Sequence, residues 1–142
     1  MAVQKVSQSQ LPSTIVGTKA AFAGSISGAS ENEYFHPGSV ASATGAATQT
    51  VAQSARIPYA GTLQSLYLVS DVAAAGTGEK FVLYINGVAS ALEATILAAA
   101  TTASNVVDAP AVAAGDKVAV FYDPASDHGV GEVAWGFELR AS

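Results

Sequence analysis

Residues 80–97, KFVLYINGVASALEATIL, restrict the fold more strongly than any other stretch of this sequence. The Asn86-Gly87 dipeptide best tolerates the positive φ angles at both centres of a type I′ turn, the tightest connection between two antiparallel strands. A hairpin with this turn places Phe81 opposite Leu92. Its large apolar side chains then share one face, which holds Phe81, Leu83, Ile85, Val88, Leu92 and Ile96.

The other face of the predicted hairpin is polar. Lys80 lies opposite Glu93 there, and opposite charges across two strands favour the pairing. A helix is the competing interpretation, because Val88, Leu92 and Ile96 also follow each other at helical spacing in a segment rich in Ala, Leu and Glu. We favour the hairpin, since a turn signal between alternating residues is the strongest short-range indication of one.

Residues 132–140 show the clearest alternation in the chain, and the predicted inward side chains are Val133, Trp135, Phe137 and Leu139. Other short strands are separated by turn signals about every 8–12 residues. This pattern predicts an all-β fold, an antiparallel β-sandwich of jelly-roll type. An immunoglobulin-like sandwich is the alternative, although Trp135 lies in the last strand and has no cysteine pair on which to pack.

The strand predicted over residues 61–72 is apolar on both faces. Leu66 and Leu68 lie on one face, while strict alternation puts Leu63, Tyr67 and Val69 on the other. A strand of an antiparallel sheet that is apolar on both sides is expected to be buried on both sides. We therefore predict that Leu63, Tyr67 and Val69 contact another subunit.

Residues 1–18 carry isolated apolar side chains among Gln and Ser, and Pro12 bars both a continuous helix and a central strand. Such a segment is either a disordered terminus or an extended arm that binds a neighbouring chain. The second interpretation divides the chain into an arm, 1–18, and a jelly-roll domain, 19–142. The arm residues expected to fill pockets on a partner are Val3, Val6, Leu11, Ile15 and Val16.

Length and composition point to one domain with an unusually neutral surface. The chain has 142 residues, of which 12% are charged, about half the usual share. A net charge of −5 argues against a nucleic-acid partner. No apolar run is long enough to span a bilayer, and the first residues form no apolar signal region, so we expect no membrane partner and synthesis in the cytoplasm without a signal peptide. The absence of cysteine excludes thiolate metal sites.

The residues that could carry chemistry are few. His36 lies between Phe35 and Pro37, where a turn or interface role is the simplest interpretation. His128 follows Asp127, and Asp123 precedes both, but this group is weak as a metal or acid–base site without a further fixed ligand. The sequence lacks a G-x-S-x-G elbow and a phosphate-binding glycine loop. We expect no catalytic residue, metal or cofactor, and hence no enzyme; a small hydrolase would need turnover that depends on His128 or Asp127.

Three segments between residues 57 and 123 resemble a group of phage-associated jelly-roll proteins. They are IPYAGTLQSLYLVSD, FVLYINGVASALEATI and VAAGDKVAVFYDP, and the matching motif positions are Pro58, 60–63, 84–88 and 114–118. The resemblance covers about half of the chain and rests on turn residues. It implies a sandwich similar to tumour-necrosis-factor-like heads, which pack as trimers. Such domains occur as capsid decoration (cement) proteins and as heads of tail fibres or surface filaments.

The resemblance and the residue patterns together lead to one hypothesis. It is a virion protein that binds the capsid exterior as a homotrimer, with the major capsid protein as its partner and the arm as its clamp. The alternative is a receptor- or glycan-binding head of a tail fibre or filament, with recognition in the loops 73–78 and 124–131.

Overall fold

The computed structural model describes residues 19–27, 32–40, 45–124 and 131–142. These residues form two antiparallel sheets. Sheet A has the order β1-β10-β4-β7, with β8 also beside β4; its strands are β1 (Lys19–Ser27), β10 (Glu132–Ala141), β4 (Gly61–Ser70), β7 (Thr102–Asn105) and β8 (Ala111–Val112). Sheet B has the order β2-β9-β5-β6, with β3 also beside β9; its strands are β2 (Glu33–Phe35), β9 (Lys117–Pro124), β5 (Glu79–Ile85), β6 (Val88–Ile96) and β3 (Ala55–Arg56).

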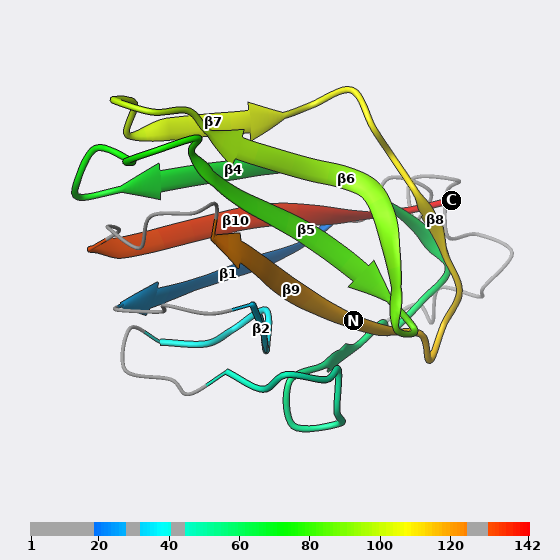
Figure 1. Cartoon of the computed structure of the whole chain (residues 1–142). Coiled ribbons are helices and arrows are strands. Elements are labelled where there is room, and N and C mark those ends of the chain that lie inside the picture. Colours follow the sequence, from blue (N-terminus) through cyan, green and yellow to red (C-terminus); the bar gives the residue numbers. More distant parts are fainter. Residues whose placement is uncertain (1–18, 28–31, 41–44, 125–130) are drawn as a thin grey trace, which may run out of the picture.

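The two sheets pack face to face, with β9, β5 and β6 in front of β1, β10 and β4 in Figure 1. The chain crosses between the sheets at most of its connections, and its first and last strands pair in sheet A. This arrangement is the predicted antiparallel β-sandwich, with the strand order of a jelly roll. Among the described residues, no helix has the length and apolar character needed to span a bilayer.

The core fills the space between the sheets. The inward side chains predicted for the last strand are all buried, and Trp135 lies with its ring centroid 6.2 Å from that of Phe81. The Trp135 indole N–H donates a hydrogen bond to the Pro37 carbonyl at 2.8 Å, so this polar group is satisfied within the core. The largest fully buried side chains are Tyr122, Phe35, Phe81, Ile26, Ile57, Leu63, Leu66, Leu68, Leu83, Leu92, Ile96 and Leu139.

The predicted hairpin is present as β5 and β6. Asn86 and Gly87 have φ angles of 52° and 83°, as the type I′ turn requires. The predicted register holds next to the turn, but a β-bulge between Val82 and Tyr84 then shifts it by two residues, so that Phe81 faces Ala94. A shift of two keeps every side chain on its face.

The bulge leaves most of the predicted apolar face of the hairpin in the core and changes the charged pair on the other face. Val88 is the exception, with 68% of its surface exposed beside the turn. Lys80 now lies opposite Thr95, yet its ammonium still reaches the Glu93 carboxylate diagonally at 2.9 Å.

β4 contains a second bulge, and because of it the strand does not alternate as the sequence predicted. Ser65 has a φ angle of 58°, and the register between β4 and β10 shifts by one residue at this point. The extra residue reverses the alternation, so that Leu63 joins Leu66 and Leu68 in the core and is 0% exposed. The prediction that Leu63 contacts another subunit is therefore wrong, because strict alternation does not continue through Ser65.

The segment after β2 closes one side of the sandwich. The Ser39 carbonyl accepts a hydrogen bond from the Ser25 N–H of β1 at 2.8 Å, and the Gly38 N–H donates to His36 Nδ1 at 3.0 Å. A Cβ atom on Gly24 would lie 2.5 Å from the Pro37 carbonyl oxygen, so only glycine permits this close approach. His36 thus has the turn role that its neighbours predicted.

Candidate functional site

The outer face of sheet A carries a continuous patch of uncharged side chains. The cross-strand register places Gly136 of β10 between Ala23 of β1 and Tyr67 of β4, and it places Ala134 beside Val69. We call this patch the sheet A face; it consists of Ala21, Ala23, Tyr67, Val69, Thr102, Ser104, Ala134 and Gly136.

Tyr67 and Val69 carry the large apolar side chains of the sheet A face. They are 53% and 55% exposed, and their neighbours on both sides are small. Small side chains on a sheet let another protein surface approach closely, while the two large ones would lose apolar area to water on contact. The face is therefore suited to a protein partner.

Charged groups lie at the two ends of the sheet A face. At one end, the Lys19 ammonium is 3.3 Å from the Glu138 carboxylate, and Arg140 follows on β10. At the other end, Asp71 accepts a hydrogen bond from the Glu132 N–H at 2.7 Å. This second end also holds a shallow hollow of about 330 Å³, lined by Val69, Ser70, Asp71, Glu132 and Ala134.

The structure brings together two of the three residues predicted to contact another subunit. Tyr67 and Val69 project from the same face of β4, whereas Leu63 belongs to the core. The five predicted arm residues, Val3, Val6, Leu11, Ile15 and Val16, lie outside the described residues. The same holds for His128 and Asp127.

The turn residues of the phage-protein resemblance form one hydrogen-bonded unit. The Asn86 side-chain amide donates to Asp116 at 2.9 Å, and the Asn86 side-chain oxygen accepts from the Lys117 N–H at 2.9 Å. The Ala113 N–H donates to Asp116 and is the main reason that the pKa of Asp116 lies below its ordinary value; Asn86 contributes next. This unit links the β5–β6 turn to the start of β9, so these motif residues stabilise the fold.

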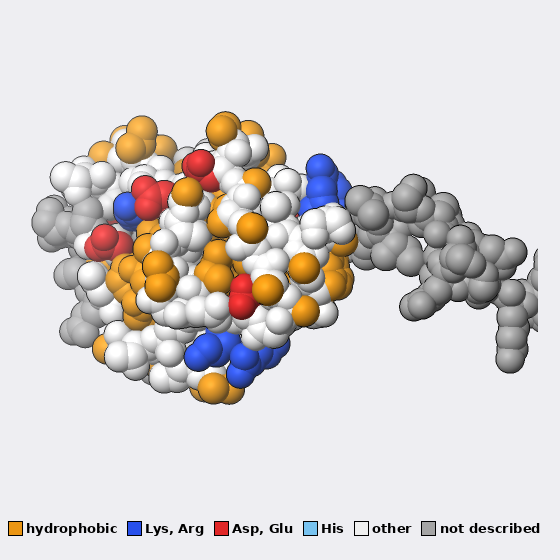
Figure 2. Space-filling model, turned by 90° about the vertical axis from the view of Figure 1, so that its right-hand side faces the viewer, with side chains coloured by type: hydrophobic (Ala, Val, Ile, Leu, Met, Phe, Trp, Pro, Cys, Tyr) orange, Lys and Arg blue, Asp and Glu red, His pale blue; other side chains and the backbone are white. Residues whose placement is uncertain are grey.

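Figure 2 shows the end of the sandwich at which these turns lie. Hydrophobic and uncharged side chains cover most of it; the basic groups gather at its edges, and the acidic groups lie singly among the others. This distribution agrees with the low charge of the chain.

Sheet B has a different outer face, which sequence reasoning did not identify as a site. Tyr34, Tyr84 and Phe121 form an aromatic cluster on it, with ring centroids 4.7–5.0 Å apart. The three rings come from β2, β5 and β9, which lie far apart in the sequence. They become neighbours because β9 pairs with both β2 and β5. One signal was available, because Phe121 occupies a position at which the alternation in β9 places outward side chains.

One polar pair lies inside the sandwich. The Tyr122 hydroxyl donates a hydrogen bond to the Glu79 carboxylate, and both residues are fully buried. Burial, followed by this hydrogen bond, raises the pKa of Tyr122 far above its ordinary value. Within the described ranges, no group of three His, Asp or Glu side chains is arranged to hold a metal ion.

Comparison with known proteins adds no assignment. No protein-family model matches this chain, and no curated protein matches it either. Its function must be argued from the two outer faces and from the resemblance carried by its turn motifs.

Proposed function

We propose that the chain is a structural virion protein, a capsid decoration (cement) protein that binds the outside of the assembled shell as a homotrimer. The sheet A face carries this proposal. An uncharged platform with half-exposed Tyr67 and Val69 at its centre is costly to leave in water and suits a second copy of the same chain. The trimeric state follows from the resemblance to phage-associated jelly rolls.

Stabilisation of the shell would follow from mass action. A protein that binds only assembled capsid subunits lowers the free energy of the shell relative to its separated subunits. In this proposal residues 1–18 contact the major capsid protein, and Val3, Val6 and Ile15 are among the side chains that enter pockets on it. Main-chain hydrogen bonds along a strand edge would add affinity that does not depend on charge.

Bare capsids test the proposal. We expect the full-length chain to co-sediment with intact capsids at a fixed stoichiometry and to raise the temperature at which they disassemble. A full-length variant with Val3, Val6 and Ile15 changed to Ser should lose most of this binding. Val107→Ser is the matched control, because Val107 is 86% exposed in the loop between β7 and β8 and lies outside residues 1–18.

Two outcomes would count against the proposal in different ways. Failure of the wild-type chain to bind any form of the capsid with which it is produced would contradict the decoration role. Equal binding by the wild type and the arm variant would leave decoration standing and refute the role of residues 1–18.

A further inference from the structure

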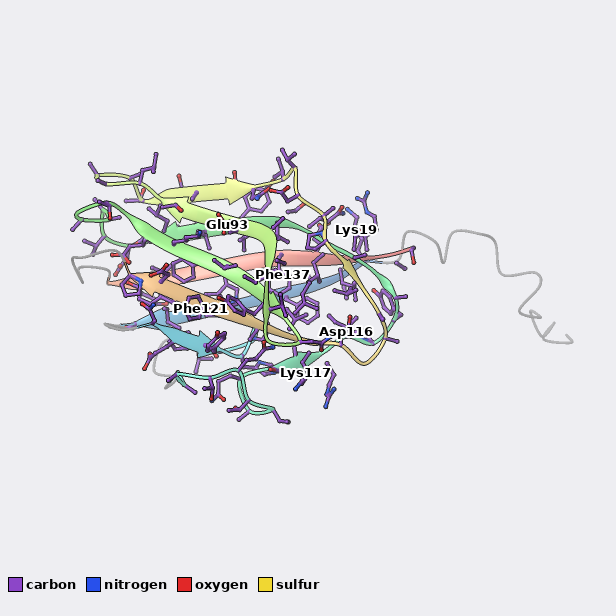
Figure 3. All side chains as sticks on the ribbon, turned by 45° about the vertical axis from the view of Figure 1, so that its right-hand side comes forward. Lys19, Glu93, Asp116, Lys117, Phe121 and Phe137 are labelled. Carbon is purple, nitrogen blue, oxygen red and sulfur yellow. The ribbon has the colours of Figure 1, made fainter. Side chains whose placement is uncertain are left out.

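The outer face of sheet B combines aromatic rings with a row of hydrogen-bonding side chains. Lys80 of β5 lies between Thr95 of β6 and Asp123 of β9 in the cross-strand register. In the next row, Val82 lies between Glu93 and Phe121. Figure 3 labels Phe121 and Glu93, which bracket this region from β9 and β6. We call the region the sheet B patch; it consists of Tyr34, Lys80, Tyr84, Glu93, Thr95, Phe121 and Asp123.

The aromatic rings of the sheet B patch are half-buried and tilted against each other. Tyr34 meets Tyr84 edge-on at 89°, and Phe121 is tilted by 47° and 49° to the two tyrosines. Contacts of this kind stabilise a sheet. Cross-strand stability explains the clustering of the rings, but it does not explain the open hollow at the row of Lys80 and Asp123 next to Phe121.

The hollow lies at the row of Lys80 and Asp123, so Phe121 stands in the neighbouring outward row and none of the three rings lines it. Its volume is about 210 Å³, and it is lined by Thr77, Gly78, Lys80, Thr95 and Asp123. This is smaller than the roughly 300–1,000 Å³ of sites that enclose drug-sized ligands, so it suits a single small ring. Two of the lining residues, Thr77 and Gly78, belong to the connection between β4 and β5.

The charges of the sheet B patch select against polyanions. Lys80 is its single cation, and it stands beside the carboxylates of Glu93 and Asp123. The hydrogen bond that the Lys80 ammonium donates to Glu93 is the main reason that the pKa of Lys80 is raised, so its ammonium stays charged at neutral pH. Burial, followed by the proximity of Tyr84, raises the pKa of Tyr34 above its ordinary value of 10.0, so its hydroxyl stays a neutral donor.

We propose that the sheet B patch binds a neutral hexopyranose unit of a glycan, stacked on Tyr84 and Phe121 and hydrogen-bonded by Lys80 and Asp123. A pyranose ring presents an apolar C–H face and a rim of hydroxyl groups. The C–H face requires an aromatic surface, and the hydroxyl groups require both donors and acceptors at its edge. The patch places Phe121 in the row next to Lys80 and Asp123, and Tyr84 one row further along.

A peptide ligand fits this geometry less well. Proline-rich peptides bind long aromatic grooves, whereas the hollow accommodates one small ring, and the backbone groups of β5 are already paired on both sides within the sheet. The patch also lies on the opposite side of the sandwich from the sheet A face. Glycan binding is therefore independent of the proposed decoration role, and a trimer formed through sheet A would leave the patch accessible.

The test is a nuclear magnetic resonance titration of the full-length, ¹⁵N-labelled protein. The probes are the methyl glycosides of glucose, galactose, mannose and N-acetylglucosamine at millimolar concentration. We expect at least one glycoside to give saturable shifts at backbone amides of β5 and β9. Tyr84→Leu, which keeps an apolar side chain but removes the ring, should weaken binding about tenfold. Tyr84→Phe keeps the ring and should change binding much less.

Several results would overturn the proposal. They are the absence of saturable shifts with all four glycosides, shifts confined to other parts of the domain, and unchanged binding by Tyr84→Leu. Saturable shifts in β5 and β9 with a proline-rich peptide but with no glycoside would replace the glycan with a peptide ligand. Tyr67→Leu on the sheet A face is the matched control and should bind the glycoside like the wild type. A circular-dichroism melt of each variant separates lost binding from lost folding.

Discussion

The outer faces of the two sheets differ in the size and charge of their side chains, although both carry apolar groups. The centre of the sheet A face is uncharged, and its two large side chains stand among alanine, glycine, serine and threonine. The sheet B patch has aromatic rings packed against one another beside a row of charged groups. A neutral surface with exposed apolar side chains suits another protein surface, while rings beside charges suit a small polar ligand.

The two outer faces differ because strand register decides which side chains reach each face. Ser65 moves Leu63 into the core and leaves Tyr67 and Val69 as the exposed apolar pair on β4. In sheet B, pairing of β9 with β2 and β5 brings Phe121 next to Tyr34 and Tyr84. Each face therefore depends on register, and substitutions can separate core residues from face residues.

The largest effect is expected from Leu63, which alternation groups with Tyr67 and Val69 but which the structure buries. Leu63→Ala should lower the free energy of unfolding by about 2–5 kcal/mol, because it removes a fully buried side chain and leaves a cavity. Tyr67→Ala in the dissociated protein should cost less than about 1 kcal/mol. Urea denaturation followed by circular dichroism measures both; equal losses would mean that Leu63 and Tyr67 share one face.

A smaller effect is expected at the linked turns, which lie apart from both faces. Asn86→Ala removes two hydrogen bonds and places alanine at a positive φ angle, so it should lower the free energy of unfolding by about 1–3 kcal/mol. Binding through either face should be unchanged. A loss of oligomerisation or glycan binding in a variant that still folds would show that this turn has a role beyond stability.

The same turns should make stability depend on pH. The pKa of Asp116 is lower in the folded state, so its ionised form stabilises the fold above the ordinary pKa of an aspartate, about 3.9. This contribution is lost as the pH falls through the lower folded-state pKa. Urea denaturation of the wild type and Asp116→Asn at neutral and acidic pH should therefore show a difference that disappears in acid. If the two proteins still differ in stability in acid, the difference comes from the geometry of the turn and not from the charge of Asp116.

The smallest effect is expected from deletion of Ser65. Removing the one extra residue of the bulge leaves Leu63 and Leu66 two positions apart in a regular strand, so both still point into the core. The free energy of unfolding should change by no more than about 1 kcal/mol, and the sheet A face should keep Tyr67 and Val69 exposed. Unfolding of the deletion variant at ambient temperature would contradict this account of the bulge.

Local signals in the sequence predicted much of the fold. Asn86-Gly87 specifies its turn through backbone chemistry alone, and the regular alternation around Trp135 indicates the last strand. The bulges could not be predicted in this way. Ser65 is an ordinary residue, and its positive φ angle arises from the pairing of β4 with β10. A single extra residue was enough to misplace Leu63.

The candidate sites were predicted less completely than the fold. Tyr67 and Val69 were identified because two apolar residues in the outward phase of a strand are visible in the sequence. The aromatic cluster of sheet B was missed, since its members lie in strands that are neighbours only after folding. An outward aromatic residue such as Phe121 is a signal of such a face, but its partners can be known only from the sheet order.

Native mass spectrometry of the full-length wild type and of a variant with Tyr67→Glu and Val69→Glu tests whether the sheet A face joins subunits. We expect the wild type to have the mass of three chains and the variant that of one, with a circular-dichroism spectrum like that of the wild type. Burial of two carboxylates against an apolar surface would prevent association. An unchanged trimer in the variant, or a monomeric wild type at all concentrations, would contradict the assignment of the sheet A face as a subunit interface.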